Sequence, residues 1–463
     1  MALTIDARLA TRDLVPLLNR VFELSAEKIA ALHKSWKPER GAPVFTVGGQ
    51  YTTRGWTDWT AGFQHGSALL QFDATGQERF LDMGRTATIR QMASHVSNMG
   101  VHDHGFNIIS TYGNLWRLMN ERQIGRNERE LQIYELALKV SGAVQAARWT
   151  ALADGGGFIY SFNGPHSLFI DTLRSLRSLA VAHTLGHALM GENGQRICLL
   201  QRLVEHATAT ARHAVYHGGG RDHYDVRGRV AQETLFNTND GSHRCPSTQQ
   251  GYSPFTTWTR GLAWGICGFA EQLEFLETLS DAALEPPGGR KKVVAMFLKA
   301  ASAMADYYIA STPVCGVPYW DTGAPNLHRL GDYLERPADP FNPWEPVDSS
   351  AAAVAAQGLL RLGHHLNRTV RSGAGRRYRQ AGLSVARTLF AEPYLSVQRR
   401  HQGLLLHSVY HRPNGWDHTA PGQAVPNGES SMWGDYHARE LALMLLREAD
   451  GEPPLVFFGA IEK

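Results

Sequence analysis

Apolar residues recur with the spacing of an α-helix along most of this chain. In residues 127–138, Leu131, Tyr134 and Leu138 fall on one face, and the same period returns in further segments. This period predicts helices that each bury one stripe of side chains against a neighbour. The other predicted helices cover residues 168–185, 199–216, 261–279, 293–308, 349–362, 378–389 and 436–446.

Several of these helices have recognisable ends. Asn127, with Glu130 three residues later, resembles a capping box, and Asp348 is a predicted N-cap for an Ala-rich helix that Gly363 would end. Gly- and Pro-rich connections separate the helices, and strand alternation is limited to residues 403–410, with 229–236 as a weaker candidate. We therefore expect one all-α domain, residues 1–463, built of helix pairs with its function in the loops at one end.

Charge and cysteine usage exclude several classes of protein. The net charge of +3, with no dense block of Lys and Arg, argues against a nucleic-acid or membrane-surface protein. The four cysteines, Cys198, Cys245, Cys267 and Cys315, lie far apart without CxxC pairs, so neither structural zinc nor a disulfide framework is expected.

The N-terminal segment does not have the pattern of a signal peptide. Asp6 and Asp13 interrupt its apolar residues, and no basic start precedes an uninterrupted apolar run. No window reaches the apolar length that we expect of a membrane span. These features predict a cytoplasmic protein.

Short motifs rich in Gly, aromatic residues and one or two polar residues recur near the predicted helix ends. Rings and acids repeated at the same end of successive helices indicate a carbohydrate cleft. The motifs are WTAGFQHG (59–66), HDHGF (102–106), IDTLRSL (170–176), TRGLAWGICGF (259–269), YWDTGAP (319–325), DSSAAA (348–353), GLLLHSVYHRPNGW (403–416) and ESSMWGDY (429–436).

With these motifs, in this order over residues 55–447, the chain resembles the unsaturated glucuronyl hydrolases, glycoside hydrolase family 88. The resemblance implies an (α/α)6 barrel, six inner helices ringed by six outer ones, with the active site in loops at one mouth. It also implies substrates left by polysaccharide lyases, which end in a uronic acid with a C4=C5 double bond. In this family an aspartic acid protonates C4, water adds at C5, and the hemiketal opens and releases the neighbouring sugar. No metal and no organic cofactor take part.

The resemblance assigns the catalytic carboxylates. Asp171 matches the family's general acid and base, which must carry a proton at neutral pH to deliver it. Asp103 matches the second essential carboxylate, which holds the unsaturated ring and acts on the acid through like charge. Each residue also stands where a helix begins, so capping of that helix is the structural alternative.

The resemblance also assigns residues that bind substrate. Trp59 and Trp264 match positions that stack on the sugar, with plain core packing as the alternative. Arg260 is placed to meet a uronate carboxylate, to which its planar fork is suited, with a surface ion pair as the alternative. Gln250 matches the Gln of the family's QGY motif, whose amide can hydrogen-bond a sugar hydroxyl.

This chain departs from the family pattern on the side that holds the released sugar. Gln232 stands where a substrate-contacting His is usual, and Phe162 where the family tends to carry a site Trp. Ser175 replaces a usual Asn, and Arg174 and Arg177 are unusually basic for their helix. We expect Gln232 and the two arginines to change the choice of released sugar.

Other interpretations remain open at this stage. The HxH of His102 and His104 has no ligand partner with recognisable spacing, so no metal site is expected. The related unsaturated rhamnogalacturonyl hydrolases, a catalytically idle sugar-binding barrel and a sugar epimerase on the same barrel are the alternatives. The expected partner is an unsaturated uronyl oligosaccharide, with no nucleic acid and no membrane, and both a monomer and a homodimer stay open.

Overall fold

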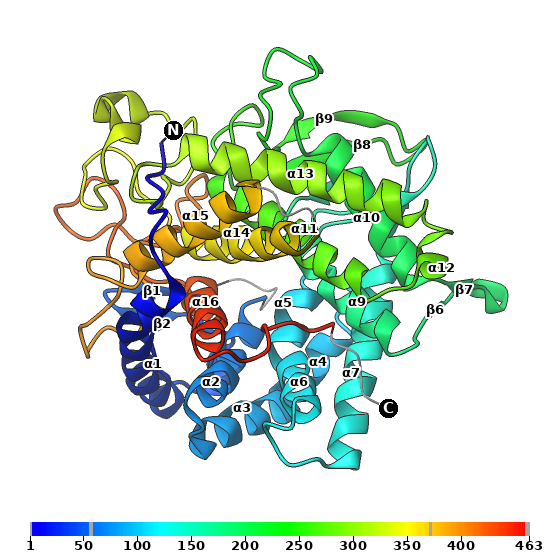
Figure 1. The fold of residues 1–463 in the computed structure, drawn as a ribbon, viewed down its shortest axis with the longest axis horizontal. Coiled ribbons are helices and arrows are strands. Elements are labelled where there is room, and N and C mark those ends of the chain that lie inside the picture. The colour runs from blue at the N-terminus through cyan, green and yellow to red at the C-terminus, as the bar shows by residue number, and fades with distance from the viewer. Residues whose placement is uncertain (1, 55–58, 370–372, 459–463) are drawn as a thin grey trace.

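The computed structural model describes residues 2–54, 59–369 and 373–458. In this part of the chain, helices pack in sequence around a closed inner ring, α2 on α5, α5 on α8, α8 on α11, α11 on α14, α14 on α16 and α16 on α2 (Figure 1). The π-helical turn η3 (Ile109–Gly113) continues α5 into α6. The inner elements are α2 (Ala61–Thr75), α5 (His104–Ile108) with α6 (Asn114–Asn120), α8 (Thr172–Ser175) with α9 (Arg177–Thr184), α11 (Thr259–Glu277), α14 (Ser349–Thr369) and α16 (Met432–Ala449).

A second layer of helices covers this ring from outside. Each outer helix packs on one or two inner ones, α1 on α2 and α16, α3 on α2, α7 on α9, α10 on α9, α13 on α11, and α15 on α14. The architecture is the predicted α/α barrel. The outer helices are α1 (Val15–Ser35), α3 (Glu78–Gln91), α7 (Glu128–Ala147), α10 (Leu199–His213), α13 (Arg290–Ser311) and α15 (Gly373–Leu389), and short helices lie at α4 (Ala93–Val96) and α12 (Asp281–Leu284).

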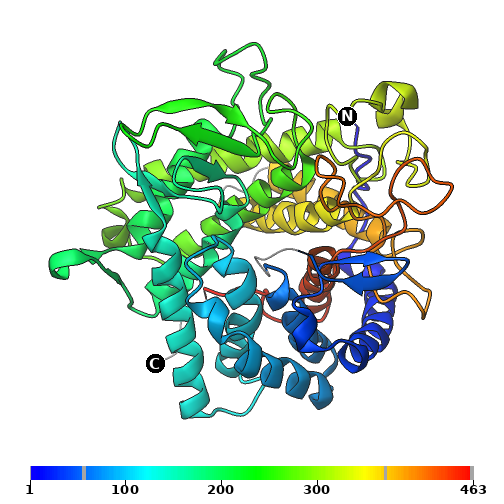
Figure 2. The same ribbon diagram turned by 180° about the vertical axis from the view of Figure 1, so that it is seen from behind.

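Short strands occur between the helices of the barrel. The hairpin β1 (Phe45–Val47) and β2 (Gln50–Thr52) pairs Thr46 with Tyr51, and β8 (Glu233–Phe236) lies between β5 (Ser167–Phe169) and β9 (His243–Ser247), antiparallel to both. Seen from behind, the β1–β2 hairpin and the β8 and β9 strands lie in front of the helices (Figure 2). The remaining pairs are β3 (Trp149–Ala151) with β4 (Gly157–Ile159), and β6 (Leu189–Met190) with β7 (Arg196–Ile197).

Most predicted helices are confirmed, with two corrections to their ends. Asn127 caps α7 by accepting hydrogen bonds from the Arg129 and Glu130 amides. Asp348 accepts from the Ser350 and Ala351 amides, as predicted for an N-cap. Gly363 does not end α14, because the helix continues to Thr369 and a Cβ at Gly363 would press on the backbone of α15.

The predicted helix over residues 168–185 was wrong in its first turn, which is strand β5. Residues 167–170 are buried on every side, and a short apolar run of this kind does not distinguish a strand from a helix. Residues 403–410 form only isolated bridges, at Leu405 and Leu406, and of residues 229–236 the last four are strand β8.

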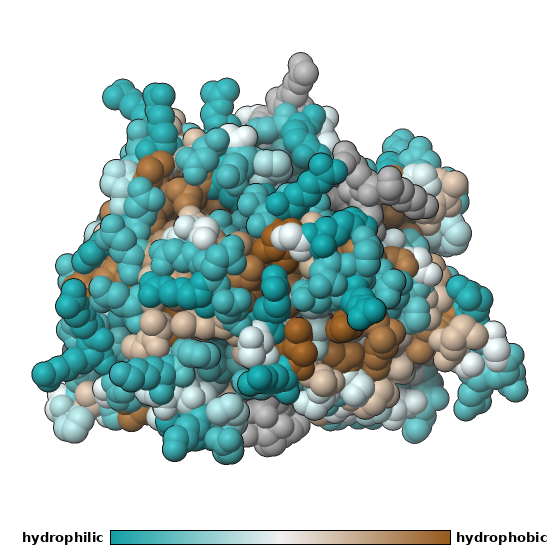
Figure 3. All heavy atoms as spheres, turned by 90° about the horizontal axis from the view of Figure 1, so that it is seen from below, coloured by the Kyte–Doolittle hydropathy of each residue, from teal (hydrophilic) through white to brown (hydrophobic). Residues whose placement is uncertain are grey.

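The buried apolar side chains form one connected cluster from Leu3 to Phe458. The face seen from below is mainly hydrophilic, with apolar side chains in separate areas (Figure 3). All four cysteines lie in the described part of the chain and are unpaired. The expectation of a single domain over the whole chain stays a prediction.

One helix corrects the expectation that no segment could span a membrane. Within the described residues, α13 alone is long and apolar enough by length and composition, and half of its apolar window is buried inside the fold. It packs on α11, α10 and α14, as a core helix does, so this is weak evidence for a span.

Candidate active site

A cavity of about 180 Å³ lies among the loops that lead into the inner helices. Every site residue predicted from the sequence lines it except Gln232. The predicted residues in its wall are Trp59, Asp103, Phe162, Asp171, Gln250, Arg260 and Trp264.

Both predicted catalytic carboxylates stand at the residue before an inner helix, Asp103 before α5 and Asp171 before α8. Neither side chain makes a capping hydrogen bond to its helix, so capping does not explain either residue. Both are nearly buried, at 7% and 9% exposure, and both line the cavity. Their oxygens are therefore available to a ligand.

His102 joins the two carboxylates. Its Nε2 lies 3.2 Å from Asp171 Oδ1 and 3.8 Å from Asp103 Oδ1. Its Nδ1 is buried and has no hydrogen-bond partner among the described residues. Sequence reasoning treated this histidine only as part of a metal-like HxH. Its place beside Asp103 in the HDHGF motif was the signal that could have identified it.

The surroundings of His102 and Asp103 shift the pKa values of both groups. Burial lowers the pKa of the His102 imidazole, but the carboxylates of Asp103 and Asp171 outweigh burial and leave that pKa above its ordinary value. Burial also raises the pKa of Asp103, against the opposing effect of His102. His102 and Asp103 can therefore hold protons at a pH at which the same groups in water would have lost them.

Ser175 ties together the two turns that carry the carboxylates. Its hydroxyl donates to the His102 carbonyl (2.7 Å) and accepts from the Gly105 amide (2.8 Å). A Cβ on Gly105 would collide with the Ser175 backbone, so glycine is required for this close approach. Ser175 therefore has a structural role beneath the site.

Aromatic rings surround the carboxylates. Phe162 stacks on the His102 ring, with centroids 5.9 Å apart and 11° between the planes. Trp59 stacks on Trp433 at 5.0 Å, and Trp264 packs against Phe106 at 5.0 Å. The two tryptophans therefore pack against other rings and also line the cavity, and their stacking on a sugar stays a prediction.

Arg260 does not form a surface ion pair, which was the alternative interpretation of this residue. It is 1% exposed, and its Nη1 donates to Asp348 Oδ2 (2.7 Å) and the Val409 carbonyl (2.5 Å). Its Nη2 donates to the Tyr410 carbonyl (2.7 Å) and approaches Gln250 Oε1 (3.4 Å). Arg260 therefore anchors the 409–410 loop in the cavity wall, and its contact with a uronate stays a prediction.

Gln232 lies behind the cavity wall. Its Oε1 accepts from the Gln249 amide (2.6 Å) and from the Thr248 hydroxyl (3.2 Å). It thereby holds the segment that presents Gln249 and Gln250 to the cavity. Direct contact between Gln232 and a sugar stays a prediction. In the structure Gln232 supports the residues that line the cavity and does not line it itself.

Arg174 and Arg177 are not among the described residues that line the cavity, so an effect of either on the choice of the released sugar stays a prediction without a direct contact to support it. Both are fully buried. Arg174 pairs with Glu271 of α11 and with Glu440 of α16 (2.8 Å), and Arg177 lies 3.6 Å from Glu440. A buried ion cluster therefore fixes α8, and with it Asp171, inside the inner ring.

Further cavity residues were not predicted from the sequence. Arg54, exposed at the cavity edge, lies over the Trp416 ring at 5.4 Å. His411, Asn414 and Trp416 come from the loop before α16. The GLLLHSVYHRPNGW motif marked this loop without indicating which side chains face the cavity. Among the described residues no group of three or more His, Cys, Asp or Glu is placed to hold a metal ion.

Comparison with known proteins adds to this geometry. No model of a known protein family matches the chain. The unsaturated glucuronyl hydrolase of Bacillus sp. (strain GL1) is 26% identical over 408 residues, which cover 85% of this chain and 88% of that protein. The chain resembles the unsaturated glucuronyl hydrolases.

Two further relatives support this resemblance over nearly the whole chain. The unsaturated chondroitin disaccharide hydrolase of Streptococcus pyogenes serotype M1 is 24% identical over 440 residues, covering 93% of this chain and 92% of that protein. The crystal structure of an unsaturated glucuronyl hydrolase specific for heparin matches with a TM-score of 0.70 at 20% identity, covering 95% of this chain and 99% of the other. The resemblance and the α/α barrel expected from the sequence are confirmed.

Proposed function

We propose that this protein is a glycoside hydrolase that removes the unsaturated uronic acid from the non-reducing end of polysaccharide-lyase products. The observation that carries the proposal is the cluster of Asp103, His102 and Asp171, nearly buried in a cavity lined by rings. Whole-length similarity to unsaturated glucuronyl hydrolases supports the same reaction.

The cluster supplies the proton that the reaction needs. Protonation at C4 of the enol ether makes C5 electrophilic, and water adds there. The hemiketal at C5 then opens to a ketone, and the hemiacetal left at C1 releases the neighbouring sugar as an alcohol. We assign proton delivery to Asp171, with His102 bonded to it and Asp103 beside both.

The surroundings favour this chemistry. Phe162 and Phe169 pack against the His102 ring and exclude water from one side of the cluster. Trp59 and Trp264 offer ring surface to the sugar. Arg54 is the cavity cation without an ion pair among the described residues, and we assign it to an anionic group of the substrate.

The similar proteins indicate a substrate class. We propose unsaturated disaccharides of glycosaminoglycan origin, because the relatives are named for glucuronyl, chondroitin and heparin substrates. A cytoplasmic location is part of the proposal, and the unpaired, exposed Cys198 and Cys245 agree with a reducing compartment.

The test is loss of the ultraviolet absorbance of the conjugated enoate over a panel of unsaturated disaccharides. The panel holds products from chondroitin, hyaluronan, heparin, gellan and ulvan, with the rhamnogalacturonan product as comparison. Decay on a glucuronyl member that Asp171→Asn abolishes is the expected result. Decay on the rhamnogalacturonan product alone would move the assignment to that related family, and binding without decay would indicate an idle barrel.

A further inference from the structure

A second cavity, of about 230 Å³, lies between the outer helices α1 and α3 and the inner helices α2 and α16. Exposed side chains, among them His33 and Gln91, stand in its wall, so a small molecule can enter from solvent. Among the described residues, none lines both this cavity and the active-site cavity. The two are therefore separate sites.

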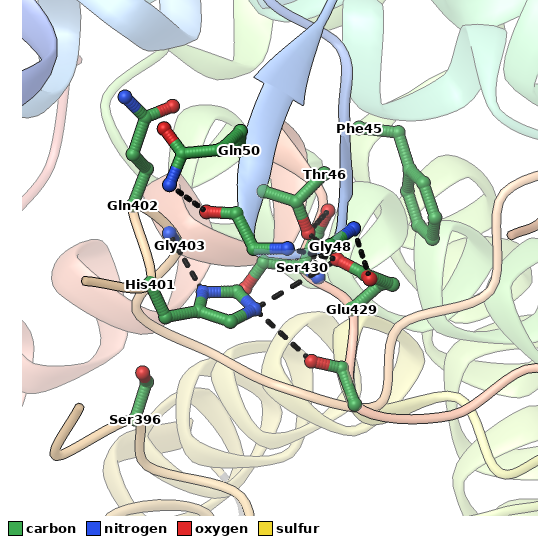
Figure 4. Close-up of polar contacts among 12 residues, drawn as sticks. Phe45, Thr46, Gly48, Gln50, Ser396, His401, Gln402, Gly403, Glu429 and Ser430 are labelled. Atoms are coloured by element: carbon green, nitrogen blue, oxygen red, sulfur yellow. Dashed lines mark hydrogen bonds and ion pairs between the residues drawn. The ribbon is translucent and has the colours of Figure 1, made fainter. Parts of the chain in front are cut away.

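The loops beside this cavity are fixed in place. Glu429 accepts hydrogen bonds from Thr46 Oγ1 (2.5 Å) and the Gly48 amide (2.7 Å), which holds the turn of the β1–β2 hairpin (Figure 4). The ring of His401 binds the Gly428 carbonyl at 3.1 Å in the same cluster. Tyr51 and Gln402, from the segments held in this way, line the cavity, so this part of its wall is preformed, as small-molecule sites usually are.

Two of the charged groups in the cavity wall are already satisfied. Lys28 Nζ donates to Ser396 Oγ and to the Gln398 and His401 carbonyls, which uses all three of its donors. Asp435 accepts from the Tyr51 hydroxyl (2.8 Å) and from backbone amides of the 404–405 segment. Neither group needs a ligand.

Arg439 and His65 each have hydrogen-bonding atoms that no described residue pairs with. Arg439 is 3% exposed and donates through Nε to Ser25 (2.7 Å) and through Nη1 to Ser67 (3.3 Å), but its Nη2 has no hydrogen-bond partner in the described chain. His65 is 7% exposed and neither ring nitrogen bonds a described residue. Burial lowers the pKa of His65 to about 4, so the ring is neutral at neutral pH and can donate one hydrogen bond and accept another.

The charge balance selects an anion. Lys28 and Arg439 carry two positive charges against the single carboxylate of Asp435, which lies 3.9 Å from Arg439 Nη1. The amide side chains of Gln64 and Gln91 add neutral hydrogen-bonding groups. The volume is below the roughly 300–1,000 Å³ of sites for drug-sized ligands, so the occupant is small.

From these contacts we infer that the cavity binds a polyhydroxylated carboxylate of the size of one uronic acid, with its carboxylate on Arg439. His65 and the glutamine amides receive the hydroxyl groups, and Trp36 and Met83 provide apolar surface for the carbon face. The arrangement does not depend on the proposed hydrolase reaction.

The test is calorimetric titration of the full chain with D-glucuronate at neutral pH, with D-glucose as the neutral comparison. Arg439→Gln removes the cation. Ala87→Phe fills the cavity from α3 without removing a polar group, and Ile89→Ala, at an exposed position on the same helix, is the matched control. The expected result is glucuronate binding that weakens at least about tenfold in both cavity variants and is unchanged in the control.

Three results would overturn the inference: no glucuronate binding to the wild-type chain, binding unchanged in Ala87→Phe, or glucose bound as tightly as glucuronate. A measurement of disaccharide hydrolysis by Ala87→Phe distinguishes the two proposals, because Ala87 lines the second cavity and does not line the active-site cavity. Full activity together with lost glucuronate binding is the expected pair of results.

Discussion

Replacement of His102 by phenylalanine isolates the bond between the imidazole and the two carboxylates. A phenyl ring keeps the shape and the stacking on Phe162, at 5.9 Å and 11° in the wild-type chain. It removes the Nε2 that lies 3.2 Å from Asp171 and 3.8 Å from Asp103. The change therefore tests the charge and the hydrogen bond rather than the packing.

The magnitude follows from the kind of bond that is lost. A hydrogen bond to a charged group contributes roughly 1.5–3 kcal/mol. If that energy supports proton delivery, kcat falls by about 10- to 150-fold, because each 1.36 kcal/mol is tenfold in rate. The pH profile changes too. The pKa of His102 is raised above 6.5, so the wild-type imidazole keeps its proton to a higher pH. The wild-type rate should fall at the alkaline pH where that proton is lost. The variant has no imidazole and should not show this fall.

The assay is the decay of enoate absorbance on an accepted disaccharide as a function of pH, with kcat and KM separated. His104→Phe is the matched control. It is equally buried, but its ring bonds Ser141 and the Asn98 carbonyl and it does not line the cavity. A His102→Phe protein with wild-type kcat and an unchanged alkaline limb would refute the reasoning.

Three further changes test the scaffold. Glu440→Gln leaves the buried Arg174 undercompensated, and we expect the free energy of unfolding, measured with urea, to fall by about 3–5 kcal/mol. Gly105→Ala forces its Cβ into Ser175, and we expect a loss of roughly 1–3 kcal/mol with a lower kcat, whereas wild-type stability would contradict the close approach. Burial lowers the pKa of Lys28 to about 8 from 10.5, so the unfolded chain binds more protons between those values. There the unfolding free energy of the wild type should rise relative to Lys28→Met, by at most about 1.4 kcal/mol per pH unit, and parallel curves would contradict it.

Helix content could be predicted from the sequence because apolar periodicity is a local property. The errors occurred where tertiary contacts decide. The predicted helix wrongly included residues 168 and 169 of strand β5, because a fully buried strand has no polar alternation. Gly363 was predicted to end a helix, but its missing side chain instead allows α14 to pack closely against α15. The first three long helices, α1 to α3, were not singled out at all.

The positions of the site residues were predicted through the family motifs, and their partners were not. Asp103 and Asp171 lie in one cavity, as expected, but the contact of His102 with both was not predicted, although its place beside Asp103 in the HDHGF motif pointed to it. The ion pair of Arg260 joins it to Asp348, 88 residues away along the chain, which sequence patterns do not show. The burial of Arg174 beside Glu440 likewise depends on how α8 meets α16.

The most direct test of the central claim is a time course that follows enoate absorbance and the released sugar in the same reaction. We expect absorbance to be lost no later than the sugar appears, because hydration of the double bond precedes release. We also expect Asp171→Asn to stop both signals. Release of the sugar ahead of the loss of absorbance would mean direct attack at the anomeric carbon, and would contradict the proposed reaction.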